Sequence, residues 1–582
     1  MSFSSVSIAM TGSGGAGVMT AGQMLVDAAA RAGWYGLMGR SLGPQIRGGE
    51  SAALLRLSPQ PVQSPDDFYD LLVAVDWGNI ERFASELPLH AETVIISDPA
   101  QGPVPALMLE QSPLVIEVPL KDIARSTPGG RVNMVALGLV AAAIGIPAAT
   151  IEQVLGTVLG KKGAEVIAQS LASLHAGMQA AEPLAGHLRP LAPPTAAGQE
   201  RWSITGNEAT GLGALRGGVR FCAAYPITPA TEVLEWLAPN LTHVGGTLVQ
   251  AEDELASINM CLGGSFGGVP SLTATSGPGL ALMTEGLGLA VASETPVVVV
   301  DVMRGGPSTG IPTKSEQSDL NIAVYGLHGD APHIVTAPLS IADCVFTAQW
   351  SVMLAESRQC PVIMLSDQAA GQSRAVLDRP TLPDFHAHRL RAEAAEGDYQ
   401  RYALTADGVS PMAIPGTAGT TYTADGLEHS PKGTPSTQAR HHQEQLDKRL
   451  RKLTEFDYGP AWADISGPPD ADMAVITFGS ITEQVREALA RAAETGLHAR
   501  LIAVRLLAPA RPAQMAAALQ GIGKLLVVEQ NHSAQFHSLL RAQYDLPPLV
   551  HTLHRPGPLA LRPHEIVTAL GALAQADACV AA

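Results

Sequence analysis

Short apolar runs bounded by glycine or proline recur along this chain and constrain its fold more than any other feature. In the middle of the chain they are "PSLTATS" (270–276), "TPVVVVDVM" (295–303), "PHIVTA" (332–337) and "CPVIMLSD" (360–367). Uninterrupted apolar runs of this length are typical of strands buried on both faces, as in a parallel sheet covered by helices. We therefore predict an α/β fold with a doubly wound sheet in this region.

The chain has several domains, because 582 residues are too many for a single core. Residues 1–185 alternate strand-like with helical segments, which predicts a first α/β unit with a parallel sheet. A Pro/Ala/Gly-rich linker at 186–200 leads to the doubly wound unit at 201–376. A connecting segment at 377–465 is irregular apart from one charged helix, and a third α/β unit is expected at 466–582. So long a connection indicates a functional segment or one that wraps a neighbouring subunit.

Composition excludes several classes of protein. A net charge of −17 argues against nonspecific nucleic-acid binding. The sequence contains no run of eighteen uncharged apolar residues, and "MSFSSVSIAMT" at its start lacks the basic region of a signal peptide. The five cysteines include no CxxC pair, so no local motif predicts a zinc site or an iron–sulfur cluster. We expect a cytoplasmic protein that binds neither nucleic acid nor a membrane.

The segment 225–232, "YPITPATE", places Thr228 between two prolines. Pro226 and Pro229 fix φ and lack an N–H, so they confine the loop to few conformations. Pro229 also suits the first turn of a following helix. Taken alone, the segment is explained at least as well by an ordinary strand-to-helix turn.

Two further motifs follow in the same unit. Glu254 stands at the start of an expected helix, nine residues before Gly263, and a later strand ends in "TSGPG" at 275–279. The helix dipole also favours an acidic residue in a first turn, but this explanation leaves the Gly-Pro-Gly turn unexplained. "RGGPSTGIPT" at 304–313 then begins with an arginine at the end of a buried strand, which suits bidentate binding of a carboxylate. A surface arginine before a loop is the alternative.

A Gly-rich turn, "GSGGAG" at 12–17, lies between the first expected strand and helix. Its backbone amides, including those of Gly14 and Gly15, could bind an anion, and Arg47 in the nearby "RGGE" could contact a phosphate. A dinucleotide site is the alternative, although no acidic residue follows at the end of a clear second strand.

Together, "YPITPATE", "AEDELA" (251–256), "TSGPG" and "RGGPSTGIPT" closely resemble the alpha subunit of the 2-oxoacid:ferredoxin oxidoreductases. The resemblance extends over nearly the whole chain. The N-terminal unit resembles the family's gamma domain, fused here ahead of alpha, the middle unit its pyrimidine-binding domain, and the C-terminal unit its transketolase-C-like domain. The resemblance implies CoA-dependent oxidative decarboxylation of a 2-oxo acid on thiamine diphosphate, with electrons passed through iron–sulfur clusters to ferredoxin.

The resemblance also implies roles for individual residues. Thr228 would hydrogen-bond the keto-carboxyl group of the substrate, Arg304 would bind its 1-carboxylate, and Thr313 lies in the same loop. Glu254 would hydrogen-bond the aminopyrimidine ring of thiamine diphosphate. The form of "RGGPSTGIPT" and the gamma–alpha fusion favour 2-oxoglutarate, giving succinyl-CoA, whereas pyruvate and branched-chain 2-oxo acids remain open.

Half of the expected cofactor site is missing from the sequence. No GDG…N segment is present to hold Mg²⁺ and the diphosphate. We therefore expect a beta subunit that carries them together with the iron–sulfur cluster, in a dimer of heterodimers, while coenzyme A would contact Gly14, Gly15 and Arg47. Two other classes remain as alternatives: a non-oxidative thiamine-diphosphate enzyme, and an inactive CoA- or nucleotide-binding assembly protein.

Overall fold

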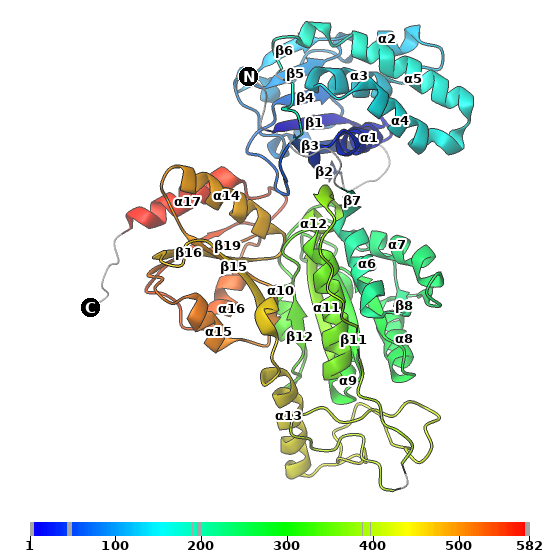
Figure 1. Ribbon diagram of the computed structural model, residues 1–582, viewed down its shortest axis with the longest axis vertical. Helices are drawn as coiled ribbons and strands as arrows, with labels where there is room; N and C mark the ends of the chain where they lie inside the picture. The colour runs from blue at the N-terminus through cyan, green and yellow to red at the C-terminus, as the bar shows by residue number, and fades with distance from the viewer. Residues whose placement is uncertain are drawn as a thin grey trace. The chain divides into compact units, whose positions relative to one another are not determined.

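The computed structural model describes residues 5–43, 49–188, 190–194, 200–386, 388–395 and 397–576. Contacts within these residues divide the chain into two compact units (Figure 1). Unit 1 comprises Met1–Thr205, Gln372–Thr381 and Pro558–His564, and unit 2 comprises Gly206–Gly371, Leu382–Gly557 and Glu565–Ala582. The chain therefore returns to unit 1 twice after leaving it.

Unit 1 is built on an eight-stranded sheet in the order β6-β5-β4-β1-β3-β2-β14-β7. The strands are β1 (Val6–Ser13), β2 (Tyr35–Leu42), β3 (Glu50–Ser58), β4 (Leu71–Ala74), β5 (Val94–Ser97), β6 (Leu114–Glu117), β7 (Arg201–Thr205) and β14 (Arg374–Asp378). β1, β4, β5 and β6 are parallel, but β1–β3, β3–β2, β2–β14 and β14–β7 are antiparallel. The expected parallel sheet is therefore wrong for half of this unit. β2, which the sequence pattern did not predict, is too close to β3 in the chain for the crossover that parallel pairing requires.

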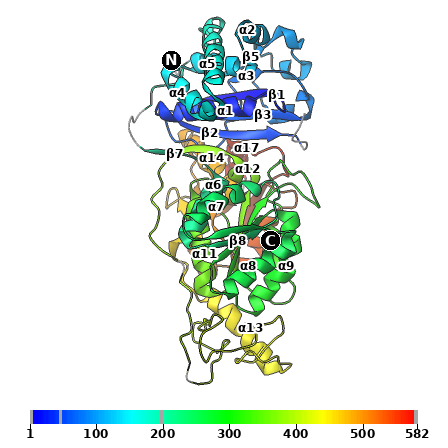
Figure 2. The ribbon, with the colours of Figure 1, turned by 90° about the vertical axis from the view of Figure 1, so that its right-hand side faces the viewer.

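Helices cover one face of this sheet (Figure 2). They are α1 (Val18–Arg31), α2 (Leu120–Ser126), α3 (Val132–Ile144), α4 (Ala148–Leu159) and α5 (Ala164–Gln179). Ile8 and Met10 of β1 pack in the core under the helices, whereas Ala9 packs in a separate core on the opposite face. This alternation follows from the two-residue period of a strand.

The boundary between the units differs from the one expected at residues 201 and 376. Strand β14 pairs with β2 on one side and with β7 on the other, so both β7 and β14 belong to the sheet of unit 1. The middle unit begins instead at α6 (Gly206–Gly217) and ends at α12 (Gln368–Gln372). β7 and β14 are distant from each other in the sequence, so no local sequence pattern predicts that they pair. The boundary between the two units therefore could not be predicted from the sequence.

The doubly wound sheet predicted from the apolar runs is confirmed in unit 2, in the order β18-β12-β13-β11-β10-β8-β9. Its strands are β8 (Phe221–Ala224), β9 (Thr247–Gln250), β10 (Ser271–Thr275), β11 (Val297–Met303), β12 (Ile334–Thr336), β13 (Pro361–Asp367) and β18 (Leu506–Ala508). Every pair is parallel except β12–β18. The helices of this part are α6, α7 (Thr231–Thr242), α8 (Glu254–Phe266), α9 (Gly277–Ala292), α10 (Leu320–Tyr325), α11 (Asp343–Arg358) and α12.

The C-terminal part of unit 2 has a five-stranded sheet in the order β15-β17-β16-β19-β20. Its strands are β15 (Ala463–Ser466), β16 (Met473–Phe478), β17 (Arg500–Val504), β19 (Lys524–Glu529) and β20 (Leu549–His554). The helices are α14 (Thr482–Glu494), α15 (Pro512–Ala518), α16 (Gln535–Gln543) and α17 (Pro563–Gln575). Because β18 joins the edge of the seven-stranded sheet, the two sheets share one hydrophobic core.

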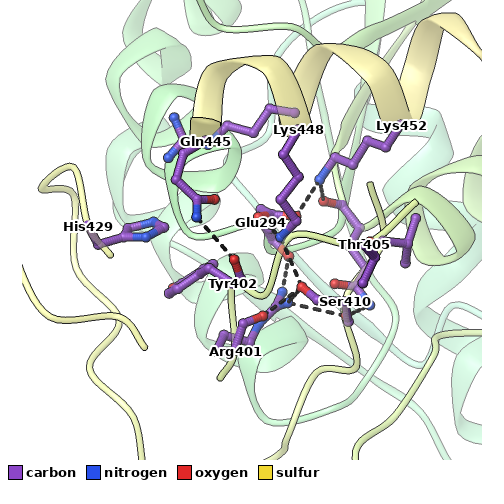
Figure 3. Close-up of polar contacts among 12 residues, drawn as sticks. Glu294, Arg401, Tyr402, Thr405, Ser410, His429, Gln445, Lys448 and Lys452 are labelled. Atoms are coloured by element: carbon purple, nitrogen blue, oxygen red, sulfur yellow. Dashed lines mark hydrogen bonds and ion pairs between the residues drawn. The ribbon is translucent and has the colours of Figure 1, made fainter. Parts of the chain in front are cut away.

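The connecting segment has no helix or strand in its described residues from Leu382 to the start of α13 (Ala439–Thr454). A buried polar cluster attaches it to the rest of unit 2 (Figure 3). Lys448 donates to Oε1 of Glu294 at 2.6 Å, and Lys452 donates to Oε2 of the same carboxylate at 2.9 Å. Arg401 donates to the Glu294 carbonyl oxygen at 2.8 Å. Burial alone would raise the pKa of Glu294, but the surrounding cations outweigh burial and hold it well below its usual range.

Candidate functional site

The loop between β8 and α7 carries Thr228, and hydrogen bonds from a residue of α6 hold this loop in place. Asn207, which is almost fully buried, donates from Nδ2 to the carbonyl oxygen of Pro229 at 2.9 Å and to the Glu232 carboxylate at 3.0 Å. Thr228 is half-buried, and among the described residues its hydroxyl has no hydrogen-bond partner. The loop therefore holds a hydroxyl group in place and leaves it available to a ligand.

Arg304 follows β11 directly and reaches the Thr228 loop. Its Nη1 donates to the carbonyl oxygen of Thr228 at 2.5 Å, and its Nη2 donates to that of Thr309 at 2.8 Å. The side chain is buried, and Nε has no hydrogen-bond partner within the described part of the chain. β8 and β11 are both parallel strands of one sheet, so the loops after them meet at the same edge, where ligands of doubly wound folds bind.

The loop after Arg304 folds back on itself. Ile311 donates its N–H to the carbonyl oxygen of Gly305 at 2.8 Å, and Gly305 donates to that of Lys314 at 3.1 Å. Gly310 has a φ of 56°, and a Cβ atom there would lie 1.7 Å from the Gly305 oxygen, so the turn requires glycine. Thr313 is buried on the returning arm of this loop.

Glu254 is the first residue of α8, and the preceding Asp253 caps the helix by accepting from the Ala256 N–H at 2.7 Å. Since Asp253 has the capping role, helix capping does not explain Glu254. The Glu254 side chain is 7% exposed, and no hydrogen bond to its carboxylate occurs among the described residues. A Cβ at Gly279 would lie 2.8 Å from Glu254 Oε1 and 2.0 Å from Thr275 Oγ1. The two motifs therefore meet, and Glu254 can pack there only because residue 279 is glycine.

The C-terminal part of unit 2 contacts the end of the loop after Arg304, residues 304–319, which is called the arginine loop below. Gln317 donates its backbone N–H to the Gln530 carbonyl oxygen at 2.7 Å, and the Gln530 N–H donates to Gln317 Oε1 at 2.9 Å. Asn531 donates from Nδ2 to the Gln317 carbonyl oxygen at 3.3 Å. Gln530 and Asn531 directly follow β19 (Lys524–Glu529), so residues at the end of this strand contact the loop after Arg304.

Sequence reasoning missed two acidic residues beside Arg304. Asp301 lies on β11 and is fully buried, and Asp319 ends the arginine loop. Burial, together with the neighbouring Asp319, raises the pKa of Asp301 well above its usual range, although Arg304 lowers it. Burial and then Glu316 raise the pKa of Asp319 to about 7. A lone aspartate inside the apolar run "VVVVDVM" could have indicated the pair, because an unpaired buried charge is strongly unfavourable.

In unit 1 the Gly-rich turn lines a cavity of about 1130 Å³. Its lining includes Gly15 and three basic residues, Lys121, Arg131 and Lys162. The Gly14 N–H is already bonded to the carbonyl oxygen of Gly49 at 2.6 Å, so it is not available to an anion. Arg47 lies outside the described residues.

An internal carboxylate occupies part of the same turn. Asp76 accepts from the Ser13 N–H at 3.0 Å, from its hydroxyl at 2.8 Å and from the Gly78 N–H at 2.9 Å. The amides nearest to β1 therefore bind a side chain of the protein, and the basic residues supply the positive charge of the cavity.

The structure also settles the state of the thiols. Cys222, Cys261, Cys344 and Cys360 are buried and free, and Cys579 lies outside the described residues. No three histidine, cysteine or acidic side chains gather as metal ligands in the described part of the chain. Likewise, none of its described helices is long and apolar enough to cross a membrane.

Comparisons with known proteins cover almost the whole chain. A family model described as "Pyruvate ferredoxin/flavodoxin oxidoreductase" matches residues 7–180, and one described as "Pyruvate flavodoxin/ferredoxin oxidoreductase, thiamine diP-bdg" matches residues 212–448. The 2-oxoacid:ferredoxin oxidoreductase 2 subunit alpha of Aeropyrum pernix is 30% identical over 604 residues, covering 93% of this chain and 94% of the relative. The 2-oxoglutarate synthase subunit KorA of Methanothermobacter marburgensis is 36% identical over 373 residues, covering 61% of this chain and 96% of the relative.

A solved structure is similar over the same extent. It is the 2-oxoglutarate:ferredoxin oxidoreductase from Magnetococcus marinus with 2-oxoglutarate, coenzyme A and succinyl-CoA bound. Its TM-score is 0.91 at 36% identity, and the match covers 98% of this chain and 100% of that chain.

Proposed function

Because this chain belongs to the 2-oxoacid:ferredoxin oxidoreductase family, we propose that it is the fused gamma–alpha subunit of an enzyme acting on 2-oxoglutarate. The reaction is the reversible, CoA-dependent oxidative decarboxylation of 2-oxoglutarate to succinyl-CoA and CO₂, with electrons passed to ferredoxin. The observation that carries the proposal is the contact between Arg304 and the Thr228 loop at the carboxyl edge of the doubly wound sheet.

Arg304 and Thr228 have the donors that a 2-oxo acid requires. Two N–H groups of the guanidinium hold backbone carbonyls, and Nε is buried without a partner among the described residues. A guanidinium can donate five hydrogen bonds, so donors remain for the 1-carboxylate. The Thr228 hydroxyl would donate to the keto-carboxyl group, and Thr313 of the same loop would contact the substrate.

Glu254 fits the aminopyrimidine ring of thiamine diphosphate. Its carboxylate is buried, accepts no hydrogen bond from the described residues and packs against Gly279. A buried acceptor without a donor is costly, and a ring N–H of the cofactor would relieve that cost. When bound, thiamine diphosphate supplies the nucleophilic carbon and the electron sink for decarboxylation. Glu254 would orient the ring and hold the proton that it shares with the ring nitrogen.

A partner subunit is supported by the surface around Glu254. α8 and α9 pack side by side (Figure 2), and they leave Leu255, Met260 and Leu282 exposed at 50%, 43% and 51%. Large apolar side chains that stay exposed on neighbouring helices suit an interaction surface. The proposed occupant is a beta subunit that carries Mg²⁺, the cofactor's diphosphate and the iron–sulfur cluster, in a dimer of heterodimers.

The cavity of unit 1 supports a site for coenzyme A. Lys121, Arg131 and Lys162 line it together with Gly15. Coenzyme A carries three phosphate groups, and Lys and Arg side chains are the usual phosphate ligands of proteins. Arg47 is proposed as a further contact. The Gly14 N–H cannot donate to a phosphate, because it donates to the carbonyl oxygen of Gly49.

The test is an anaerobic assay of the complex purified with its natural partner. Viologen reduction is followed with 2-oxoglutarate and with pyruvate, each with and without coenzyme A. Rapid CoA-dependent reduction with 2-oxoglutarate is expected. Activity with pyruvate and none with 2-oxoglutarate would show that the substrate is pyruvate, while the class of reaction would stay as proposed. No reduction with any 2-oxo acid, from a complex holding thiamine diphosphate and its cluster, would reject the oxidoreductase and favour a non-oxidative enzyme.

A further inference from the structure

Asp301 is fully buried and Asp319 is half-buried, and the two carboxyl groups share a side-chain hydrogen bond and both interact electrostatically with Arg304. No donor from the described residues reaches either oxygen of Asp301 or Oδ2 of Asp319. Buried oxygens without donors are unfavourable, but a proton between the two groups lets each hydrogen-bond the other. Two carboxyl groups that share a hydrogen bond also cannot both ionise at ordinary pH. The geometry therefore requires at least one proton on the pair.

The position of Asp319 is held from two directions. A Cβ at Gly277, the first residue of α9, would lie 2.5 Å from Asp319 Oδ1, so the carboxyl group packs against the beginning of that helix. Gln535 of α16 brackets the residue: its Nε2 donates to the Ser318 carbonyl oxygen at 2.9 Å, and its Oε1 accepts from the Asn321 N–H at 2.9 Å. Asp319 is thus positioned by both parts of unit 2.

Few other charges face the pair. Arg304 and Glu316 act on it electrostatically, and Glu316 itself accepts from the Gly557 N–H at 3.1 Å. The residues opposite Asp301 on the neighbouring strands are Thr275 and Leu365, which carry no charge. On β13, Asp367 accepts instead from the Ala370 N–H at 2.9 Å, and on α8 the Glu254 carboxylate lies against Gly279.

We propose that Asp301 and Asp319 form a proton-sharing pair that sets the strength with which Arg304 binds the carboxylate of the substrate. With one proton the pair carries a negative charge, which offsets the guanidinium charge. With two protons it is neutral, and Arg304 presents its full positive charge to the incoming carboxylate. Binding therefore draws a proton from solvent onto the pair. Both residues are positioning residues, and the inference rests on the proposed role of Arg304.

The pH dependence has a definite sign. Protonation of the pair favours binding of an anion, so the KM for 2-oxoglutarate is lowest on the acidic side and rises as the pair loses its second proton. The pair loses its second proton near neutral pH, because burial and then Glu316 raise the pKa of Asp319 to about 7. The limiting slope is a tenfold rise in KM per pH unit, because one proton is linked to one bound anion. The value of kcat does not follow this profile, because the bound state already holds the proton.

The experiment measures KM and kcat for 2-oxoglutarate between pH 6 and 9 in the complete complex. The variants are Asp319→Asn and Asp301→Asn, and Asp330→Asn, an exposed position in the same unit, is the matched control. The wild type and the control should show KM rising above about pH 7. Asp319→Asn should make KM constant within about twofold over this range, because no second acid remains to share the proton.

Each outcome decides the inference. A wild-type KM that is independent of pH would overturn it, even if both variants failed to fold. A rising KM retained in Asp319→Asn would overturn it as well. These outcomes differ from failure of the proposed function, in which the wild type reduces no acceptor with any 2-oxo acid at any pH. If Arg304→Lys left KM unchanged, Arg304 would not bind the substrate carboxylate, and the pair could not act on substrate binding through it.

Discussion

Arg304 donates a 2.5 Å hydrogen bond to the carbonyl oxygen of Thr228, although 76 residues separate the two in the sequence. The contact joins the ends of two parallel strands and leaves the Thr228 hydroxyl unpartnered among the described residues. An anion held by Arg304 would therefore lie beside a hydroxyl donor. This arrangement leads to the first two predictions.

Arg304→Lys should raise the KM for 2-oxoglutarate by about 10- to 100-fold, because an ammonium keeps the charge and loses the planar fork of donors. The measurement is steady-state viologen reduction by the complete complex. Arg541→Lys, at an exposed position on α16, is the control and should leave KM unchanged. An unchanged KM in Arg304→Lys would remove this residue from the substrate site.

Thr228→Val should lower turnover by about 10- to 100-fold, since it keeps the shape of the side chain and removes one hydroxyl donor. Thr228→Ser restores the hydroxyl and should recover most of the activity. Size-exclusion chromatography should show the same assembled complex for both variants. Equal activity in the valine and serine variants would mean that the hydroxyl does not contact the substrate.

Gly279→Ala should displace Glu254, because its Cβ would lie 2.0 Å from Thr275 Oγ1 and 2.8 Å from the Glu254 carboxylate. We expect a loss of stability of about 1–3 kcal/mol and weaker binding of thiamine diphosphate. Activity titrated against added cofactor and a thermal melt would measure both. The control is Gly288→Ala in the same helix, where a Cβ would meet nothing within 4 Å. If both substitutions had the same effect, the packing of Glu254 on residue 279 would not matter.

Lys448→Met should destabilise unit 2 by about 3–5 kcal/mol, because it removes one partner of a fully buried ion pair. Arg440→Met on the exposed side of α13 removes only a surface pair and should cost less than about 1 kcal/mol. Denaturant unfolding monitored at pH 7 compares the two. Glu294 has a lowered pKa in the folded state, so its contribution to stability is present above its unfolded pKa and is lost only as the pH falls well below 4.

Lys162→Gln should raise the KM for coenzyme A about 3- to 10-fold, since it removes a cation that lines the cavity of unit 1. The adjacent Lys161 is exposed and does not line that cavity, so Lys161→Gln is a closely matched control. The KM for 2-oxoglutarate should stay constant in both variants. Equal effects of the two substitutions on the KM for coenzyme A would locate its phosphates elsewhere.

Local pattern was sufficient for much of the fold. The apolar runs at 297–303 and 361–367 are strands buried on both faces, because such runs have no polar face to present to water. The motifs around Thr228, Glu254 and Arg304 were likewise recognisable from short stretches of sequence.

Contacts between distant segments decided the rest. Part of the antiparallel half of the first sheet is formed by β7 and β14, because β14 pairs with β2, which lies more than 300 residues earlier in the chain, and β7 pairs with β14. The Gly14 amide was expected to bind an anion, and the tertiary structure assigns it to Gly49. Asp301 and Asp319 become a pair only because the loop after Arg304 returns to the end of β11.

The sequence by itself therefore determined the types of element, the motifs and the family resemblance, since these depend on local periodicity and residue type. Only the tertiary structure decided which donors remain unpaired and which carboxyl groups share a proton. The physical reason is that hydrogen-bond satisfaction and burial depend on neighbours brought together by packing, and no local pattern encodes them.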